Sequence, residues 1–211
     1  MRTASENYRR PFYALKCDVK KFFDSISHSI LLGLIQKRID DLETVDLARQ
    51  IIWSFEKTPG CGLPLGNVTS QLFANIYLNE LDQFIKHRLN IPYYLRYCDD
   101  FIILNNEPST LATLVPTILS FLLDSLQLTL HPKKIIIRKI STGIDFLGYV
   151  VLPHYQIVRT STRRRIFRKL SIPSVVARKA SVDSYIGITT HAKGYLIKQR
   201  GLLPTTSSNR F

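Results

Sequence analysis

In the stretch Tyr93-Tyr94-Leu95-Arg96-Tyr97-Cys98-Asp99-Asp100-Phe101-Ile102-Ile103-Leu104, two adjacent carboxylates lie between runs of aromatic, β-branched and aliphatic residues. This pattern predicts a strand, a tight turn and a returning strand, with the acids at the tip of a hairpin. Carboxylates about 4 Å apart repel each other by roughly 4 kcal/mol at an effective dielectric near 20. We therefore expect a cation in front of them. Magnesium is the leading candidate, because it binds carboxylate oxygens and leaves positions open for phosphate oxygens. An ordinary Asp-Asp turn is the alternative.

The rest of the chain alternates strand-like and helix-like segments. Residues 12–18 predict a strand that ends on Asp18, and Ser27 is a candidate N-cap for the helix that follows. Helices are also predicted over residues 45–55, 70–89, 163–170 and 182–202, and around 116–126. Extended structure is predicted at 128–137, and a hairpin at 146–158. The alternation up to residue 150 predicts an α+β fold.

A loop rich in glycine and proline precedes the predicted helix 70–89. Residues 58–66 contain three glycines and two prolines, which is typical of a loop. Asn67 or Thr69 is the expected N-cap of the helix. Free amides at such a helix start can bind a phosphate or allow the backbone to approach a base pair.

Positive charge is concentrated in the last part of the chain. The 211 residues favour one main domain with a smaller appendage. Residues 151–211 carry 12 Lys and Arg against one acid, whereas residues 1–150 carry 17 against 15. This distribution predicts binding to a polyanion, namely nucleic acid or an anionic membrane. The uncharged, mostly apolar run at residues 108–123 contains Pro, Ser and Thr and is shorter than a membrane span, so it predicts a buried helix. Nucleic acid is therefore the favoured partner.

The cysteines, histidines and N-terminus carry little further signal. Cys17, Cys61 and Cys98 match neither a disulfide framework nor the paired spacing of a zinc site, and the histidines show no ligand spacing. No signal peptide is evident at the N-terminus. These observations favour a reducing, cytoplasmic location.

Several stretches resemble, in order and spacing, the palm motifs of reverse transcriptases. They are Asp18 with Phe22-Phe23, residues 63–78, Tyr97-Cys98-Asp99-Asp100, Lys133-Lys134 and Phe146-Leu147-Gly148-Tyr149. The resemblance implies an antiparallel palm sheet with packed helices over residues 12–158. It further implies a basic, helical, thumb-like region over residues 159–211. Residues 1–11 are then an N-terminal remnant, and the fingers are largely absent.

The resemblance also implies the catalytic residues. Asp18 and Asp99 resemble the carboxylates that hold two magnesium ions, with the Val19 carbonyl as a main-chain ligand and Asp100 as a supporting acid. Two ions about 3.5–4 Å apart stabilise the attacking and leaving oxygens of such a transfer.

Nucleotide-binding and primer-binding residues follow from the same resemblance. Phe23 lies at the position of the gate that crowds a ribose 2′-OH, with a core aromatic as the alternative; for Phe22 we favour the core. Gly66 and Gln71 belong to the loop expected against the templating base pair. Lys133 or Lys134 is expected near the triphosphate, with a solvated pair at a strand start as the alternative. The primer-grip residues are Phe146, Leu147, Gly148 and Tyr149, and the expected nucleic-acid-binding residues are Arg163, Arg164, Arg165, Arg168 and Lys169.

The loop before the long helix bears on the branch of the family. Intron-encoded reverse transcriptases usually carry Gln-Gly-x-x-x-Ser-Pro there, whereas this chain has Leu65-Gly66-Asn67-Val68-Thr69-Ser70-Gln71. This loop resembles that of diversity-generating retroelement enzymes, which copy template RNA into cDNA with frequent errors opposite adenine. The resemblance implies template RNA, a DNA or cDNA primer, dNTPs and a small basic accessory protein as partners.

Alternatives to an active polymerase of this branch stay open. A complete set of three acids facing one another favours an RNA-directed DNA polymerase. Only about ten residues precede Phe12, where the fingers normally lie, and this favours a truncated, inactive nucleic-acid-binding remnant. A group II intron maturase-type reverse transcriptase is the third reading.

Overall fold

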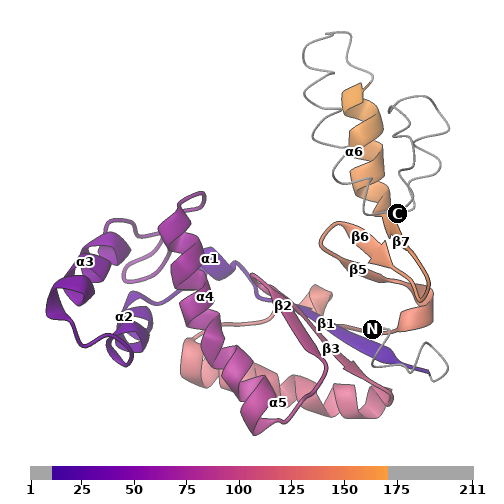
Figure 1. Cartoon of the computed structure of the whole chain (residues 1–211), viewed down its shortest axis with the longest axis horizontal. Coiled ribbons are helices and arrows are strands. Elements are labelled where there is room, and N and C mark those ends of the chain that lie inside the picture. The colour runs from indigo at the N-terminus through magenta and orange to yellow at the C-terminus, as the bar shows by residue number, and fades with distance from the viewer. Residues whose placement is uncertain (1–10, 171–211) are drawn as a thin grey trace, which may run out of the picture. The chain divides into compact units, whose positions relative to one another are not determined.

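The computed structural model describes residues 11–170 (Figure 1). The chain divides into two compact units, with the division between Arg138 and Lys139, and each unit is described by itself. The predicted helix at 182–202 lies outside the described residues.

A four-stranded sheet forms the centre of the first unit, in the order β2-β3-β1-β4. Its strands are β1 (Tyr13–Asp18), β2 (Tyr94–Tyr97), β3 (Asp100–Asn105) and β4 (Ile136–Lys139). β3 pairs antiparallel with both β1 and β2. Alternate residues point to opposite faces of a strand, and one face of β1 and β3 is fully buried through Leu15, Cys17, Phe101 and Ile103. The predicted α+β class and the acidic hairpin are confirmed.

The first unit also contains α1 (Phe22–Ser25), α2 (His28–Gln36), α3 (Leu42–Trp53), α4 (Val68–Gln83), the π-helical turn η1 (Phe84–Arg88) and α5 (Pro108–Leu126). α5 packs against β1 and β3, and α4 packs between α5 and α2, which in turn contacts α3 (Figure 1). The apolar stripe of α4, which includes Phe73, Tyr77 and Leu81, lies in the core. Ser27 and Asn67 occupy the N-cap positions of α2 and α4, as predicted, although neither side chain makes a capping bond.

The helix predicted around residues 116–126 begins earlier than expected, within the run 108–123 that was predicted to be a buried helix. The helix begins at Pro108, which occupies its first turn, and Pro116 lies inside it. Both prolines would fit the first turn of a helix, where the backbone amides have no helical acceptor. Pro108 occupies such a position, whereas Pro116 lies farther along and leaves one helical carbonyl without its donor. The 19-residue helix is long and apolar enough to cross a membrane by length and composition alone, contrary to expectation. Leu111, Ile118, Leu122 and Leu126 are buried in the core.

The predicted extended segment at 128–137 is interrupted. A 3-10 turn, η2 (Pro132–Lys134), lies between Leu130, which bridges to Val19, and the start of β4. Proline at the start of the turn fixes its backbone and has no amide to give to a strand ladder. Lys133 and Lys134 therefore lie on a turn and not at the start of a strand.

The second unit contains an antiparallel three-stranded sheet and a helix. Its elements are the 3-10 turn η3 (Ile140–Thr142), β5 (Ile144–Phe146), β6 (Tyr149–Val151), β7 (Gln156–Val158) and α6 (Thr160–Leu170). Leu147 and Gly148, with φ of 52° and 83°, form the two-residue turn between β5 and β6. Positive φ at both positions matches the twist of a tight hairpin. The pairing of β6 with β7 confirms the predicted hairpin. Residues 146–148, which were expected to extend its first strand, instead form the end of β5 and the turn before β6.

Candidate active site

Asp99 lies in the two-residue turn that joins β2 to β3. Tyr97 and Asp100 are cross-strand partners, so only Cys98 and Asp99 form the turn. Cys98 has a φ of 55°, a left-handed conformation that is uncommon and strained for a residue other than glycine. The turn therefore depends on the surrounding structure for its shape.

The register of the sheet brings Asp18 and Asp100 together. They are direct partners at the ends of β1 and β3, and directly opposite residues point to the same face of a sheet. The amide of Val19 donates to the Asp99 carbonyl at 3.2 Å, which ties the turn to the end of β1. Residues 18 and 99, far apart in sequence, therefore lie at adjoining ends of the sheet.

Cationic side chains approach these carboxylates. Lys134 Nζ donates to Asp18 Oδ2 at 2.6 Å, and Lys16 Nζ lies 3.8 Å from Asp100 Oδ1. The bond to Asp18 raises the pKa of Lys134. Burial raises the pKa of Asp100; Lys16 offsets part of this rise, and the charges of Asp18 and Asp99 add to it. Lys134 is therefore beside the acids, while Lys133 is an exposed neighbour on the same turn.

The residues present suit a cation, although the acids do not converge as predicted. Within residues 11–170, no group of three His, Cys, Asp or Glu side chains is gathered closely enough to hold a metal ion. Like charges in such proximity repel each other, and the ammonium of Lys134 offsets the charge of Asp18. Asp100 Oδ1 is buried without a hydrogen-bond partner, and a lysine ammonium already contacts Asp18. Both observations fit a site built to receive positive charge.

A cleft of about 720 Å³ opens beside the turn. Its lining includes Phe23, Gly66 and Gln71, three of the predicted nucleotide-binding residues, together with Asn75 and Cys98. Gly66 has a φ of 98°, which favours glycine there. Neither Lys133 nor Lys134 is among the residues that line this cleft. The structure thus groups part of the predicted nucleotide site in the cleft and places Lys134 at the carboxylates.

Backbone hydrogen bonds position the glycine-rich loop against the segment that carries Phe23. The amide of Leu63 donates to the Phe23 carbonyl at 2.8 Å, and the amide of Gly62 donates to the Ile26 carbonyl at 2.9 Å. Phe22 is buried in the core, as favoured, whereas Phe23 is partly exposed and packs edge-to-face on Phe22. The two phenylalanines therefore face different surroundings.

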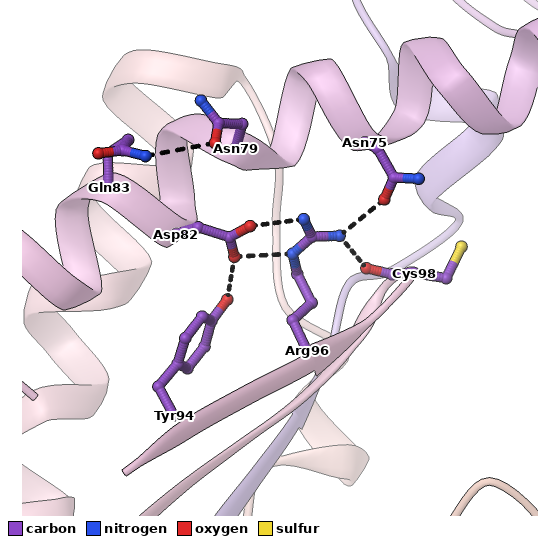
Figure 2. A network of polar contacts seen from close by, with 7 residues as sticks. All are labelled: Asn75, Asn79, Asp82, Gln83, Tyr94, Arg96 and Cys98. Carbon is purple, nitrogen blue, oxygen red and sulfur yellow. Dashed lines mark hydrogen bonds and ion pairs between the residues drawn. The ribbon is translucent and has the colours of Figure 1, made fainter. Parts of the chain in front are cut away.

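A polar network under the hairpin was not predicted (Figure 2). Arg96 forms a two-bond pair with Asp82 of α4, at 2.8 Å from Nε and 2.6 Å from Nη2. Its Nη1 donates to Asn75 Oδ1 at 3.3 Å and to the Cys98 carbonyl at 3.1 Å, and the Tyr94 hydroxyl donates to Asp82 Oδ1 at 2.7 Å. Burial raises the pKa of Tyr94, and Asp82 adds to the rise. The sequence did contain a signal for this network: Arg96 lies at a position of β2 that, by strand alternation, points toward the interior.

The remaining predicted residues lie in the second unit. Phe146 and Tyr149 are partners on either side of the Leu147-Gly148 turn, and Arg159 forms an ion pair with Asp145 beside them. On α6, Arg164, Arg165 and Arg168 are exposed and Arg163 is partly exposed. The side chain of Lys169 lies outside the described residues.

Sequence comparison places the chain among reverse transcriptases. The model of the family "Reverse transcriptase (RNA-dependent DNA polymerase)" matches residues 3–151. The group II intron-encoded protein LtrA of Lactococcus lactis is 36% identical over 94 residues, which cover 39% of this chain and 16% of LtrA. Protein YkfC of Escherichia coli is 25% identical over 205 residues, covering 79% and 52%. The retron Ec73 reverse transcriptase of E. coli is 33% identical over 107 residues, covering 44% and 33%.

Solved structures share the fold. Apo telomerase from Candida tropicalis superposes with a TM-score of 0.59 at 16% identity, covering 86% of this chain and 37% of that one. The foamy viral protease-reverse transcriptase in complex with an RNA/DNA hybrid gives a TM-score of 0.52 at 16% identity, covering 93% and 24%. The antiparallel sheet, the paired acids and the family match agree, and the chain belongs to the reverse transcriptase (RNA-dependent DNA polymerase) family.

Proposed function

We propose that this chain carries the catalytic palm of an RNA-directed DNA polymerase that uses two magnesium ions. The proposed ligands are Asp18, the Val19 carbonyl, Asp99 and Asp100. The observation that carries this proposal is the pairing of Asp18 with Asp100 directly beside the Asp99 turn, within a chain matched to the family. When bound, the ions would stabilise the attacking 3′-oxygen and the leaving pyrophosphate.

The chain's own residues have separate proposed roles around this centre. Phe23 and the Gly66 loop line the cleft where the incoming base pair would lie. Lys134 brings a positive charge to the acids, which supports a proposed role in binding triphosphate oxygens. Positioning supplies much of the rate in such a transfer, so the walls of the cleft matter as much as the charges.

Primer extension on an RNA template tests the proposal. A labelled DNA primer annealed to RNA is incubated with the protein, dNTPs and Mg²⁺, with EDTA as the control. Template-dependent products that vanish with EDTA are expected. A protein that binds the hybrid tightly and adds no nucleotide would instead support the inactive nucleic-acid-binding remnant.

Phe23→Ala is expected to raise incorporation of ribonucleotides relative to deoxynucleotides about tenfold or more, equal to about 1.4 kcal/mol of lost discrimination. The ring is partly exposed in the cleft, so its removal opens space without touching the acids. Competition between rNTPs and dNTPs measures the ratio. Phe22→Ala is the matched control, because Phe22 is buried and its loss should lower stability and leave sugar selection unchanged. Equal ratios of rNTP to dNTP incorporation in both variants would show that Phe23 is a core aromatic and not a sugar gate.

We further propose that the enzyme is of the diversity-generating retroelement type, with a small basic accessory protein as partner. The loop from Leu65 to Gln71 supports this branch through its resemblance. Identity to LtrA favours the second candidate, an intron-encoded reverse transcriptase. The two readings differ in the expected error spectrum.

Leu65→Gln combined with Gln71→Pro should lower misincorporation opposite adenine about tenfold, a change of about 1.4 kcal/mol in discrimination. Leu65 is 76% exposed and Gln71 lines the cleft, which supports a contact of both side chains with the nascent pair. Sequencing of cDNA from the two enzymes measures the error spectrum. Proline at position 71 also removes the hydrogen bond from the Gln71 amide to the Asn67 carbonyl, so Leu65→Gln alone is the control that keeps this bond. An unchanged spectrum would favour the intron-encoded reading.

We propose that residues 12–158 act as the palm, including a primer grip at 146–149, and that residues 159–211 begin a thumb. The exposed arginines of α6 support nucleic-acid binding, because each phosphate that they neutralise releases counterions. Template RNA, a DNA or cDNA primer and dNTPs are the proposed partners, and the cytoplasm is the proposed location.

A further inference from the structure

Arg96 is almost buried on the face of β2 that points toward α4 (Figure 2). Its side chain is 11% exposed and that of Asp82 is 22% exposed. Leu95 and Tyr97, at the alternate positions, are exposed. An ion pair therefore occupies the inward side of the hairpin, where a core would ordinarily have apolar side chains.

Stability alone does not account for a cation in this place. Two charges lose their hydration when buried, and apolar side chains of similar volume often stabilise such a position as well or better. A guanidinium does something that an apolar side chain does not: it donates several hydrogen bonds in a fixed plane. The bonds that Arg96 makes outside the ion pair are thus the informative ones.

Those bonds reach the turn that carries Asp99. Arg96 Nη1 donates to the Cys98 carbonyl at 3.1 Å, and Cys98 has the left-handed backbone that starts the turn. On the other side, the Val19 amide holds the Asp99 carbonyl at 3.2 Å. The turn is therefore held from α4 through Arg96 and from β1 through Val19.

We propose that Arg96 is a positioning residue for Asp99. Anchored on α4 by Asp82 and Asn75, it fixes the Cys98-Asp99 turn and so determines where the Asp99 carboxylate lies relative to Asp18. This inference rests on the proposed role of Asp99 as a metal ligand. Asn75 also lines the cleft, so the same contact sets the hairpin relative to the nucleotide side of α4.

The test compares Arg96→Lys and Arg96→Met with Tyr94→Phe in the 211-residue protein. Lysine keeps a charge for Asp82 but has a single nitrogen, which does not serve both Asp82 and the Cys98 carbonyl. Tyr94→Phe removes the hydroxyl bond to Asp82 and leaves the Arg96 bonds to Asp82, Asn75 and the Cys98 carbonyl in place, so it is the matched control. Arg96→Lys keeps the test valid if Arg96→Met does not fold.

Two measurements are made on each variant. Amide hydrogen exchange compares Val19, which reports the position of the turn, with Leu15 and Ile103 in the sheet centre. Electron paramagnetic resonance measures Mn²⁺ affinity. Both Arg96 variants should exchange Val19 at least tenfold faster than the parent, with Leu15 and Ile103 unchanged, and should bind Mn²⁺ at least fivefold more weakly. Tyr94→Phe should leave both quantities at the parent's values.

The outcomes separate this inference from the proposed function. The positioning role is overturned if the exchange rates of Val19, Leu15 and Ile103 change by the same factor in the Arg96 variants. It is also overturned if Val19 exchanges at the same rate in the Arg96 variants as in Tyr94→Phe. Faster Val19 exchange in a protein that shows no Mn²⁺ binding supports the anchoring of the turn and overturns the metal-dependent function instead. Weaker Mn²⁺ binding with selective Val19 exchange supports both.

Discussion

Asp99→Asn is expected to reduce nucleotide incorporation at least a hundredfold, equal to about 2.7 kcal/mol in activation free energy. An amide offers one neutral oxygen where a charged ligand is required for the cation. Asp18→Asn should behave in the same way, because Asp18 is fixed at the end of the adjoining strand. Steady-state primer extension on an RNA template measures the effect.

Binding of the template should persist in the same variants, because affinity rests mainly on phosphate contacts with basic side chains. Asp46→Asn is the matched control, since this exposed acid of α3 pairs only locally with Arg49 and Gln50. It should retain the parental rate. Activity within tenfold of the parent in Asp99→Asn would contradict the catalytic assignment.

Asp82→Ala should lower the free energy of unfolding by about 3–5 kcal/mol. The substitution leaves the nearly buried guanidinium of Arg96 without its counter-charge and the Tyr94 hydroxyl without its acceptor. Urea denaturation followed by circular dichroism measures the change.

Asp46→Ala provides the comparison, because its pair with Arg49 is exposed on both sides. Exposed pairs contribute about 0–1 kcal/mol, so a small effect is expected there. If Asp82→Ala and Asp46→Ala destabilise the protein equally, the network of Figure 2 does not hold the hairpin to α4.

The acidic hairpin was predictable because its signal is local. Alternating apolar residues set both strands, and the register of the turn follows from Tyr97 facing Asp100. Asp18 was found for a similar reason, since a strand pattern ends on it. The family resemblance then related Asp18 to Asp99, and the register of β1 and β3 shows their ends meeting.

Features set by tertiary contacts were not predictable in this way. No periodicity pairs Asp82 with Arg96, because their meeting depends on how α4 packs against β2. The helix predicted around 116–126 started too late because Pro108 and Pro116 both satisfy the local rule for a first turn. In the structure, Leu111 in the turn after Pro108 is buried in the core. Lys134 reached Asp18 through a 3-10 turn that the strand-like sequence concealed.

Anomalous diffraction from crystals soaked in Mn²⁺ tests the central claim most directly, because it locates the cation without requiring turnover. The account predicts a manganese peak in contact with the carboxylates of Asp18 and Asp99, with Lys134 Nζ displaced from its 2.6 Å contact with Asp18 Oδ2. A map with no manganese at these acids, and with Lys134 still bound to Asp18, would contradict it.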